Sequence, residues 1–369
     1  MRRLKRKLVW SLGTVAIVVL LVVLAVYQRP QPPVSGLKTA REALLAAQNT
    51  NAVRYASEAY VEAKTAYDSA MHYWAVENDR FILARNYSTV EYWVAQTLRK
   101  AVEAGELSGR RAASADNRLK QALQEAENQS RLYDRYYKHL PLPAAVTRNH
   151  NRGVMKLAEA KFSWQNRRFN EAEAHLAEAE GLLHHSNEKA EALVRAWFGA
   201  HSSWQKQTQQ AIRQSNGGQK VILVDKLAHR CVVYQTGKII RTFDVELGIN
   251  WLGDKQRKGD KATPEGVYRI SRKKAGGQTK FYKALLLNYP NDRDRARFAA
   301  AKRNGSLSAK ADIGSLIEIH GMGGKGVDWT DGCIALHNQD MDALFRLVSV
   351  GTPVFIVGSV RPLNEVLGE

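Results

Sequence analysis

A cysteine that directly follows a glycine, and a histidine thirteen positions before it, are the residues of this chain best suited to covalent chemistry. They are Cys333, Gly332 and His320. A thiol attacks a carbonyl carbon as the thiolate, and an imidazole within hydrogen-bond reach can take its proton. Glycine permits a tight turn, so the amides around Cys333 could stabilise a developing oxyanion. The pattern predicts a cysteine nucleophile, against the simpler interpretation of a small buried thiol and a strand-end histidine.

The glycine-rich segment between the two residues ends on three side chains that we expect to line a substrate site, Trp329, Thr330 and Asp331. A metal site is an alternative, since the residue types fit zinc, but the spacing of its ligands matches no known framework; it would use His320, Asp331, Cys333 and His337. The other cysteine, Cys231, alternates with valines and is interpreted as a packed, inert thiol. We therefore predict no metal at these residues.

Several sequence words in this part of the chain resemble the L,D-transpeptidase catalytic family, also called YkuD-type, over residues 219–358. One word is a Thr-Pro-x-Gly turn before a strand, and another is Ile319-His320-Gly321. The most specific is the closing word at Cys333. In order, the words begin at Lys261, Asn288, Ile319 and Asp328. The resemblance does not extend to residues 1–215.

The resemblance implies a mechanism for peptidoglycan stem peptides. Cys333 would attack the carbonyl of meso-diaminopimelate in a tetrapeptide stem, release D-alanine and form an acyl-enzyme. His320 would be the base, the Gly321 carbonyl would orient it, and the amides near Gly332 and Cys333 would form the oxyanion hole. An amine of a neighbouring stem would then take the acyl group and give a 3-3 crosslink, a step in cell-wall biogenesis and cell shape. The resemblance implies that neither step uses ATP, a metal or another cofactor.

Three departures from the family pattern leave the acceptor open. The loop from His320 to Thr330 holds nine intervening residues, fewer than in many members. Asp331 stands where many members have a second histidine, and Ala335 stands where many transpeptidases have an arginine or asparagine. Alanine at that place also occurs in members that hydrolyse. A hydrolase using the same thiol, an L,D-carboxypeptidase or endopeptidase, is therefore the first alternative, and a non-catalytic cell-wall-binding scaffold is the second.

The elements that must position these residues are short strands separated by glycine turns, which are typical of a mainly β domain. The expected strands are 221–224, 231–235, 239–247, 266–270, 284–288, 316–320 and 353–357. We expect one helix near 292–303 and another after Asn338, with residues 359–369 as a C-terminal tail.

The N-terminus predicts a membrane anchor. Leu8 to Tyr27 carries no charge and follows five cations, so it has the length of a bilayer-spanning helix with a cytoplasmic N-terminus. We predict residues 1–29 as the basic segment and single-pass anchor in the inner membrane, followed by a proline-rich linker at 30–35. The rest would lie in the periplasm, where the net charge of +19 faces envelope polymers and not nucleic acid.

Residues 36–215 are poor in glycine and show helical apolar stripes, as at Ala172, Leu176, Ala179 and Leu183. We predict a helical bundle that could be TPR-like, with breaks near Asn49-Thr50-Asn51, at Pro141–Pro143, near 151–153 and at Ser186-Asn187. This region could bind an envelope protein partner. A flexible joint at 215–218 would follow. The whole is expected to be a multidomain protein with a transmembrane helix, an all-α bundle and a mainly β L,D-transpeptidase-like catalytic domain.

Overall fold

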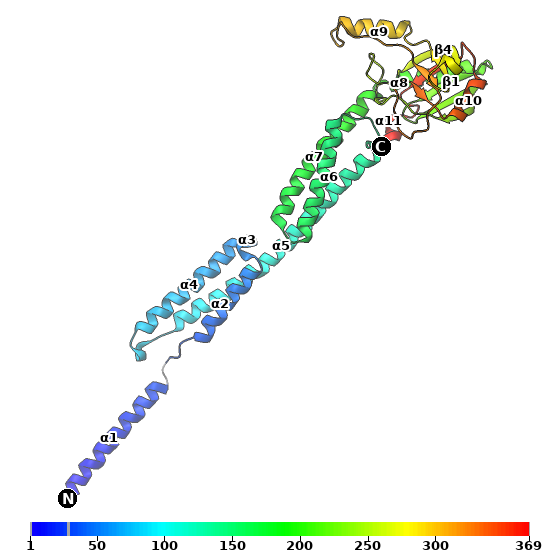
Figure 1. Cartoon of the computed structure of the whole chain (residues 1–369). Coiled ribbons are helices and arrows are strands. Elements are labelled where there is room, and N and C mark those ends of the chain that lie inside the picture. Colours follow the sequence, from blue (N-terminus) through cyan, green and yellow to red (C-terminus); the bar gives the residue numbers. More distant parts are fainter. Residues whose placement is uncertain (1, 28–29, 369) are drawn as a thin grey trace. The chain divides into compact units, whose positions relative to one another are not determined.

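A computed structural model describes residues 2–27 and 30–368, without the side chains of 2–9, 11 and 25. The contacts divide the chain into two compact units, Met1–Ala122 and Leu123–Glu369. Figure 1 labels the elements along the chain. The architecture is an N-terminal helical region followed by a mixed β half-barrel domain.

The first unit is entirely helical in its described residues. It contains α1 (Arg2–Tyr27), α2 (Val34–Asn49), α3 (Ala52–Tyr55), α4 (Ser57–Asp79), the 3-10 turn η1 (Ile82–Ala84) and the first part of α5 (Ser88–Tyr136). Small buried alanines on α4, such as Ala63 and Ala70, let it pack closely on α2. The expected break after Asn49 is present, since Asn51 adopts a positive φ of 60° and ends the helical run.

None of the described helices is both long enough and apolar enough to cross a membrane. The predicted anchor, Leu8 to Tyr27, includes residues whose side chains are outside the described set. The anchor therefore stays a prediction.

The helical part of the second unit begins within α5 and continues through α6 (Ala144–Gln165), α7 (Phe169–Phe198) and α8 (His201–Asn216). The predicted apolar stripe of α7 is confirmed, since all four of its residues are buried. Gly153 on α6 faces this stripe, and a Cβ there would lie 2.8 Å from the Leu183 side chain. The small residue thus allows α6 and α7 to approach closely.

Two expected helix breaks are wrong, because the helical backbone continues through the polar residues that suggest a turn. Near 151–153, α6 runs through without interruption. At Ser186-Asn187, α7 also continues: the Ser186 hydroxyl donates to the Leu183 carbonyl, and the Asn187 amide donates to the Gln129 carbonyl at 3.0 Å. The break at Pro141–Pro143 is confirmed as the loop between α5 and α6.

The β domain is built on one eight-stranded mixed sheet in the order β3-β2-β1-β8-β4-β5-β6-β7. Its strands are β1 (Val221–Asp225), β2 (Arg230–Gln235), β3 (Lys238–Asp244), β4 (Gly266–Ala275), β5 (Lys283–Leu287), β6 (Glu318–His320), β7 (Ile334–Ala335) and β8 (Pro353–Val357). The pairs β1–β8 and β6–β7 are parallel, and the others are antiparallel. The predicted strands are confirmed, but β7, only two residues long, was missed.

The helices of the β domain also agree with the sequence. They are α9 (Asp292–Arg303), α10 (Asn338–Leu347) and α11 (Leu363–Leu367), with a 3-10 turn η2 (Gly276–Gln278) between β4 and β5. Asn291 caps α9 by accepting a hydrogen bond from the Asp294 amide. The segment predicted as a tail therefore contains a short helix, and Leu367 on it is buried.

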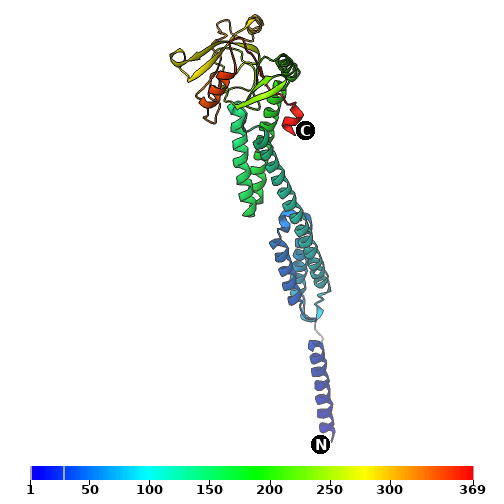
Figure 2. The same cartoon turned by 90° about the vertical axis from the view of Figure 1, so that its right-hand side faces the viewer.

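The helices α7 and α8 share one hydrophobic core with the sheet. α8 packs on β1, β2 and β8 (Figure 2). The indoles of Trp197 and Trp204 both donate to the carboxylate of Glu265, at 2.8 and 2.9 Å. The same carboxylate accepts from the fully buried ammonium of Lys226 at 2.9 Å. Glu265 belongs to the Thr-Pro-x-Gly word, so this turn joins the helices to the catalytic domain.

These contacts cross the domain boundary that the sequence predicted at 215–219. The sequence suggested a flexible joint there, because glycines follow the last helix. The two compact units instead divide within α5, and Trp204 packs so closely on the domain that a Cβ at Gly358 would lie 2.3 Å from its ring. The contacts therefore favour residues 123–369 as the folding unit.

We expect Trp204→Ala to lower the free energy of unfolding of the second unit by about 3–5 kcal/mol, the usual cost of removing a fully buried large aromatic side chain. Trp204 is only 2% exposed, and its loss would also remove a donor to Glu265. Urea unfolding followed by circular dichroism measures this change. A loss below about 1 kcal/mol would mean that α8 is only attached to the domain and that the predicted joint is correct.

Candidate active site

His320 lies on β6, and Cys333 lies next to the start of the adjacent strand β7. β6 and β7 are parallel, with Ile319 opposite Ile334 and His320 opposite Ala335, and Cys333 directly precedes β7. Side chains alternate between the two faces of a strand. Since Ile319 and Ile334 are buried in the core, His320 and Cys333 turn to the other face. The register of this strand pair brings the two predicted catalytic residues to one place.

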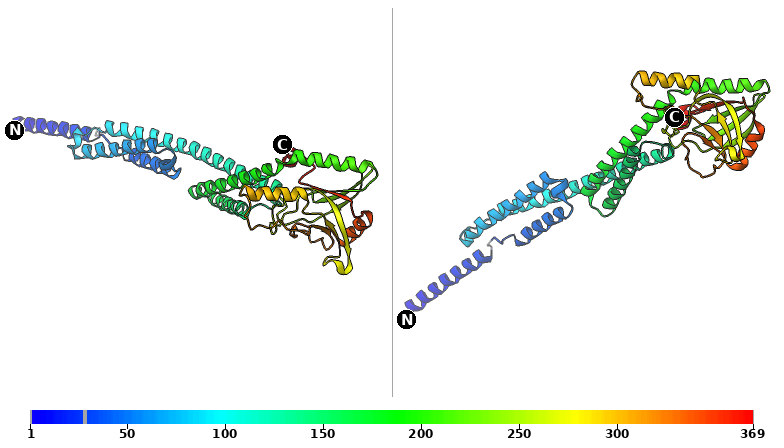
Figure 3. Two further views of the ribbon diagram at one scale, coloured as in Figure 1. Left: turned by 90° about the horizontal axis from the view of Figure 1, so that it is seen from above. Right: turned by 45° about the horizontal axis from the view of Figure 1, so that its top comes forward.

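Both residues line one cavity of about 430 Å³. One wall comes from the end of the β4–β5 hairpin, drawn in yellow in Figure 3, and the opposite wall from the segment around Trp329. Of the other predicted site residues, the cavity also includes Trp329, Thr330 and Asp331. The complete lining is Lys274, Gln278, Thr279, Lys280, Phe281, Leu316, Glu318, His320, Trp329, Thr330, Asp331 and Cys333.

The His320 imidazole is oriented as a base. Its Nδ1 lies 2.6 Å from the Gly321 carbonyl, which accepts a hydrogen bond, so in the neutral ring the proton is on Nδ1 and the lone pair is on Nε2. Nε2 has no hydrogen-bond partner among the described residues. The Phe281 ring stacks on the imidazole with centroids 3.6 Å apart. The Gly321 contact that the family resemblance implied is therefore present.

The protonation states of both groups follow from their burial. Burial lowers the pKa of the His320 imidazole below its ordinary value, although the Gly321 hydrogen bond opposes this. Burial raises the pKa of the Cys333 thiol to about 11, and the negative charge of Glu318 acts in the same direction. The thiol donates to the Leu316 carbonyl at 3.6 Å. Near neutral pH the site thus holds a neutral thiol and a neutral imidazole.

The turn at Gly332 is fixed by a threonine. Gly332 has a φ of +124°, and a Cβ there would lie 2.5 Å from the Ala262 carbonyl, so only glycine fits. The Thr330 hydroxyl donates to the Cys333 carbonyl at 2.7 Å and accepts from the Gly332 amide at 3.2 Å. The Gly332 amide is thus engaged inside the turn, which argues against its expected place in an oxyanion hole.

The segment from Gly321 to Asp331 is held by residues far away in sequence. The Glu246 carboxylate accepts from the amides of Gly324 and Gly326, and from the Trp329 indole at 2.7 Å. Asp328 accepts from the Leu247 amide at 2.7 Å. These contacts fix the ring of Trp329 at the cavity wall. Sequence reasoning missed Glu246, since nothing near it in sequence marks this role.

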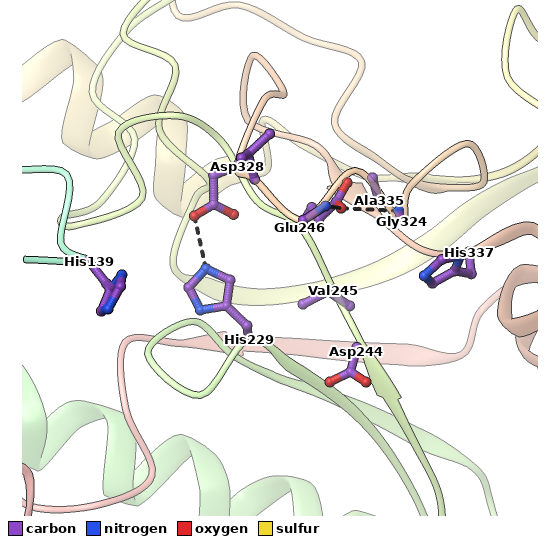
Figure 4. A pocket seen from close by; sticks show the side chains of 11 residues that line it. His139, His229, Asp244, Val245, Glu246, Gly324, Asp328, Ala335 and His337 are labelled. Carbon is purple, nitrogen blue, oxygen red and sulfur yellow. Dashed lines mark hydrogen bonds and ion pairs between the residues drawn. The ribbon is translucent and has the colours of Figure 1, made fainter.

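The same segment also lines part of a second, larger cavity of about 620 Å³ (Figure 4). Three of its lining residues are histidines from different parts of the second unit: His139, His229 and His337. His229 Nε2 lies 2.9 Å from Asp328. Burial acts to lower the pKa of His229, but the hydrogen bond and charge of Asp328 outweigh it, so the pKa lies above its ordinary value.

The metal alternative does not fit this geometry. His337 lines the second cavity, while His320, Asp331 and Cys333 line the first. Within residues 2–27 and 30–368, no group of three or more histidine, cysteine or acidic side chains is placed to hold a metal ion. Cys231 is fully buried in β2, as expected, and burial raises the pKa of its thiol to about 12.

Three charged residues in the Cys333 cavity, Lys274, Lys280 and Glu318, were missed as site residues. Lys274 Nζ lies 2.7 Å from the Glu318 carboxylate, and Glu318 is only 6% exposed. Glu318 precedes His320 by two positions on one strand, so alternation alone would have placed both on the same face. The sequence did not indicate that Lys274 lies near Glu318, because Lys274 is on another strand of the sheet.

A thiol and an oriented imidazole that share a cavity on a mixed β half-barrel define a site of the kind that thiol-dependent acyl transfer requires. Residues 219–356 carry the YkuD L,D-transpeptidase catalytic domain, by the match to its family model. The helical region that precedes it is not assigned to a family.

Two individual proteins are similar in sequence to part of this chain. The chain is 34% identical over 111 residues to YafK of Escherichia coli strain K12, a candidate L,D-transpeptidase, which is 30% of this chain and 37% of that protein. It is 26% identical over 156 residues to YqjB of Bacillus subtilis strain 168, another candidate L,D-transpeptidase, covering 40% and 77% of the two chains. This chain thus spans little more than a third of the Escherichia coli relative.

Solved structures with a similar segment include Pgp2 of Campylobacter jejuni, described as a helical cell shape determining protein. The identity is 25%, with 39% of this chain and 49% of that chain covered and a TM-score of 0.29. An L,D-transpeptidase of Xylanimonas cellulosilytica is 16% identical over 38% of this chain and 61% of that chain, with a TM-score of 0.27.

Proposed function

We propose that this protein is a membrane-anchored L,D-transpeptidase that acts on peptidoglycan stem peptides. The observation that carries the proposal is the shared cavity of Cys333 and His320, with the imidazole Nε2 unpartnered among the described residues. The YkuD domain at 219–356 supports the substrate class. The described site needs only its own thiol and imidazole for the steps that follow.

The proposed first step is acylation. His320 Nε2 takes the proton of the Cys333 thiol, and the thiolate attacks the stem carbonyl at meso-diaminopimelate. A C–S bond forms and the C–N bond to D-alanine breaks. The proton on Nε2 passes to the leaving nitrogen, so His320 returns to its neutral state.

The proposed second step is transfer to an amine of a neighbouring stem. The amine nitrogen attacks the thioester carbonyl, an amide forms and the C–S bond breaks. The thiolate regains a proton, and the product is a 3-3 crosslink. If water attacks in place of the amine, the same acyl-enzyme gives a tripeptide stem, which is the hydrolase outcome.

The test is incubation of the full-length protein, in detergent, with disaccharide-tetrapeptide, followed by mass spectrometry. We expect released D-alanine and a 3-3 crosslinked dimer. A tripeptide monomer without dimer would assign the hydrolase in place of the transferase. Intact tetrapeptide, with no acyl-enzyme, would contradict both.

The proposed location is the periplasmic face of the inner membrane, with Leu8 to Tyr27 as a single-pass anchor and the N-terminus in the cytoplasm. The five cations before Leu8 support this orientation. A reporter that is active only in the periplasm, fused after Gly36, should be active; an inactive fusion would contradict the placement. The helical region would bind an envelope protein partner.

A further inference from the structure

The mechanism above leaves one pair of charges in the cavity unused. Glu318 and Lys274 line the same cavity as Cys333, and their side chains are 8% and 16% exposed. The ion pair is 2.7 Å long. A carboxylate this well buried is uncommon unless it has a partner or a function.

For acylation alone, this carboxylate has two opposed effects. Its negative charge adds to the effect of burial in raising the pKa of the Cys333 thiol, which opposes formation of the attacking thiolate. The same charge raises the pKa of the His320 imidazole, which strengthens the base. Lys274 offsets part of that charge. Neither effect uses the carboxylate as a binding group, so its position needs a further reason.

The second half-reaction, transfer of the acyl group to an amine, supplies such a reason. A primary amine acceptor exists near neutral pH as an ammonium ion, since such groups have pKa values near 10. It must be held close to the thioester and must lose a proton before its nitrogen can attack. A buried carboxylate attracts and orients an ammonium group by charge-assisted hydrogen bonds, whereas a water molecule gains little from it.

The strand geometry places the base beside this carboxylate. Glu318 and His320 are two positions apart on β6 and face the same side, which corresponds to about 6.6 Å along a strand. The unpartnered Nε2 of His320 can then accept a proton from an ammonium held at Glu318. No other carboxylate of this cavity is buried, since Asp331 is exposed.

We propose that Glu318, with Lys274, forms the subsite for the ammonium group of the acyl acceptor. This inference rests on the proposed function and names the residues that favour amine over water. Without acceptor, Lys274 neutralises Glu318. When the acceptor binds, its ammonium hydrogen-bonds to the Glu318 carboxylate.

The protons of the transfer step balance without a further reactant. The acceptor ammonium gives one proton to His320 Nε2, which passes it to solvent. The neutral nitrogen attacks the thioester carbonyl, an N–C bond forms and the C–S bond breaks. The second proton on that nitrogen goes to the departing thiolate. Glu318 stays ionised throughout and exchanges no proton.

The test separates the two half-reactions in the full-length protein with Glu318→Gln. Acylation by a carbapenem reports the first, and the ratio of crosslinked dimer to tripeptide monomer reports the second. Removing the negative charge should change the acylation rate at pH 7 by less than about threefold, because it lowers the pKa of both the thiol and the imidazole base. Losing the charged acceptor should lower the dimer-to-tripeptide ratio about tenfold to a hundredfold.

Two further variants make the result specific. Lys274→Met removes the ammonium that competes with the acceptor for the Glu318 carboxylate, so it should raise the dimer-to-tripeptide ratio. Asp342→Asn is the matched control, because it removes a carboxylate that pairs with Lys283 at 2.5 Å outside this cavity. It should change neither the acylation rate nor the dimer-to-tripeptide ratio.

Several outcomes would overturn the inference. Equal slowing of both half-reactions in Glu318→Gln would mean a structural role only, and an unchanged product ratio would exclude an acceptor subsite. A wild-type protein that acylates but forms only tripeptide would also contradict it. A wild-type protein that forms no acyl-enzyme would instead contradict the proposed function itself, so the two failures are distinguishable.

Discussion

Replacing Cys333 by alanine is expected to abolish both dimer and tripeptide formation, with a loss of more than about a thousandfold in rate. The reason is that both products pass through one thioester, and no other described thiol can replace this one. Cys231 is fully buried, whereas Cys333 lines the cavity. Mass spectrometry after incubation with a carbapenem should show an adduct on the wild-type protein and none on Cys333→Ala.

Cys231→Ala is the matched control, because it removes the other thiol of the chain from β2. We expect the carbapenem adduct and the product ratio to stay unchanged in it. Activity of Cys333→Ala near the wild-type level would exclude both the transferase and the thiol hydrolase. The non-catalytic scaffold would then be the remaining function for this domain.

His320→Gln is expected to slow acylation by a factor of about a hundred or more near pH 7, the usual scale for losing a positioned general base. The effect should be large because the pKa of the Cys333 thiol is about 11, so very little thiolate forms without a base. The measurement is the rate of acylation by a carbapenem, with circular dichroism to show that the fold is kept.

The pH dependence distinguishes a base from a merely structural residue. As pH rises toward the thiol pKa, hydroxide ionises Cys333 without help, and the deficit of His320→Gln in alkylation by iodoacetamide should shrink. Phe281→Leu is a useful comparison, since Phe281 stacks on the imidazole but carries no proton. A deficit that stays constant from pH 7 to high pH would contradict the base role of His320.

The patterns of neighbouring residues predicted most of the strands and helices correctly. Alternation and turns predicted the strands from Val221 to Val357, and the apolar stripe predicted the buried face of α7. Errors came where polar residues resembled a helix end, as at Ser186-Asn187, although the Ser186 hydroxyl donates to Leu183 within α7 and the Asn187 amide donates to Gln129 on α5. The short strand β7 was missed because two residues cannot show a period.

The sequence by itself indicated the candidate nucleophile and its histidine, and it identified the family of the domain. These depend on neighbouring residues, and the strand that carries His320 has a local signature. Only the tertiary structure decided what surrounds them. The contacts of Lys274 with Glu318, of Glu246 with Trp329 and of Trp204 with Glu265 join residues 44, 83 and 61 positions apart. A repeating pattern of neighbouring residues cannot predict such contacts, because they depend on how distant strands, loops and helices assemble in the folded domain.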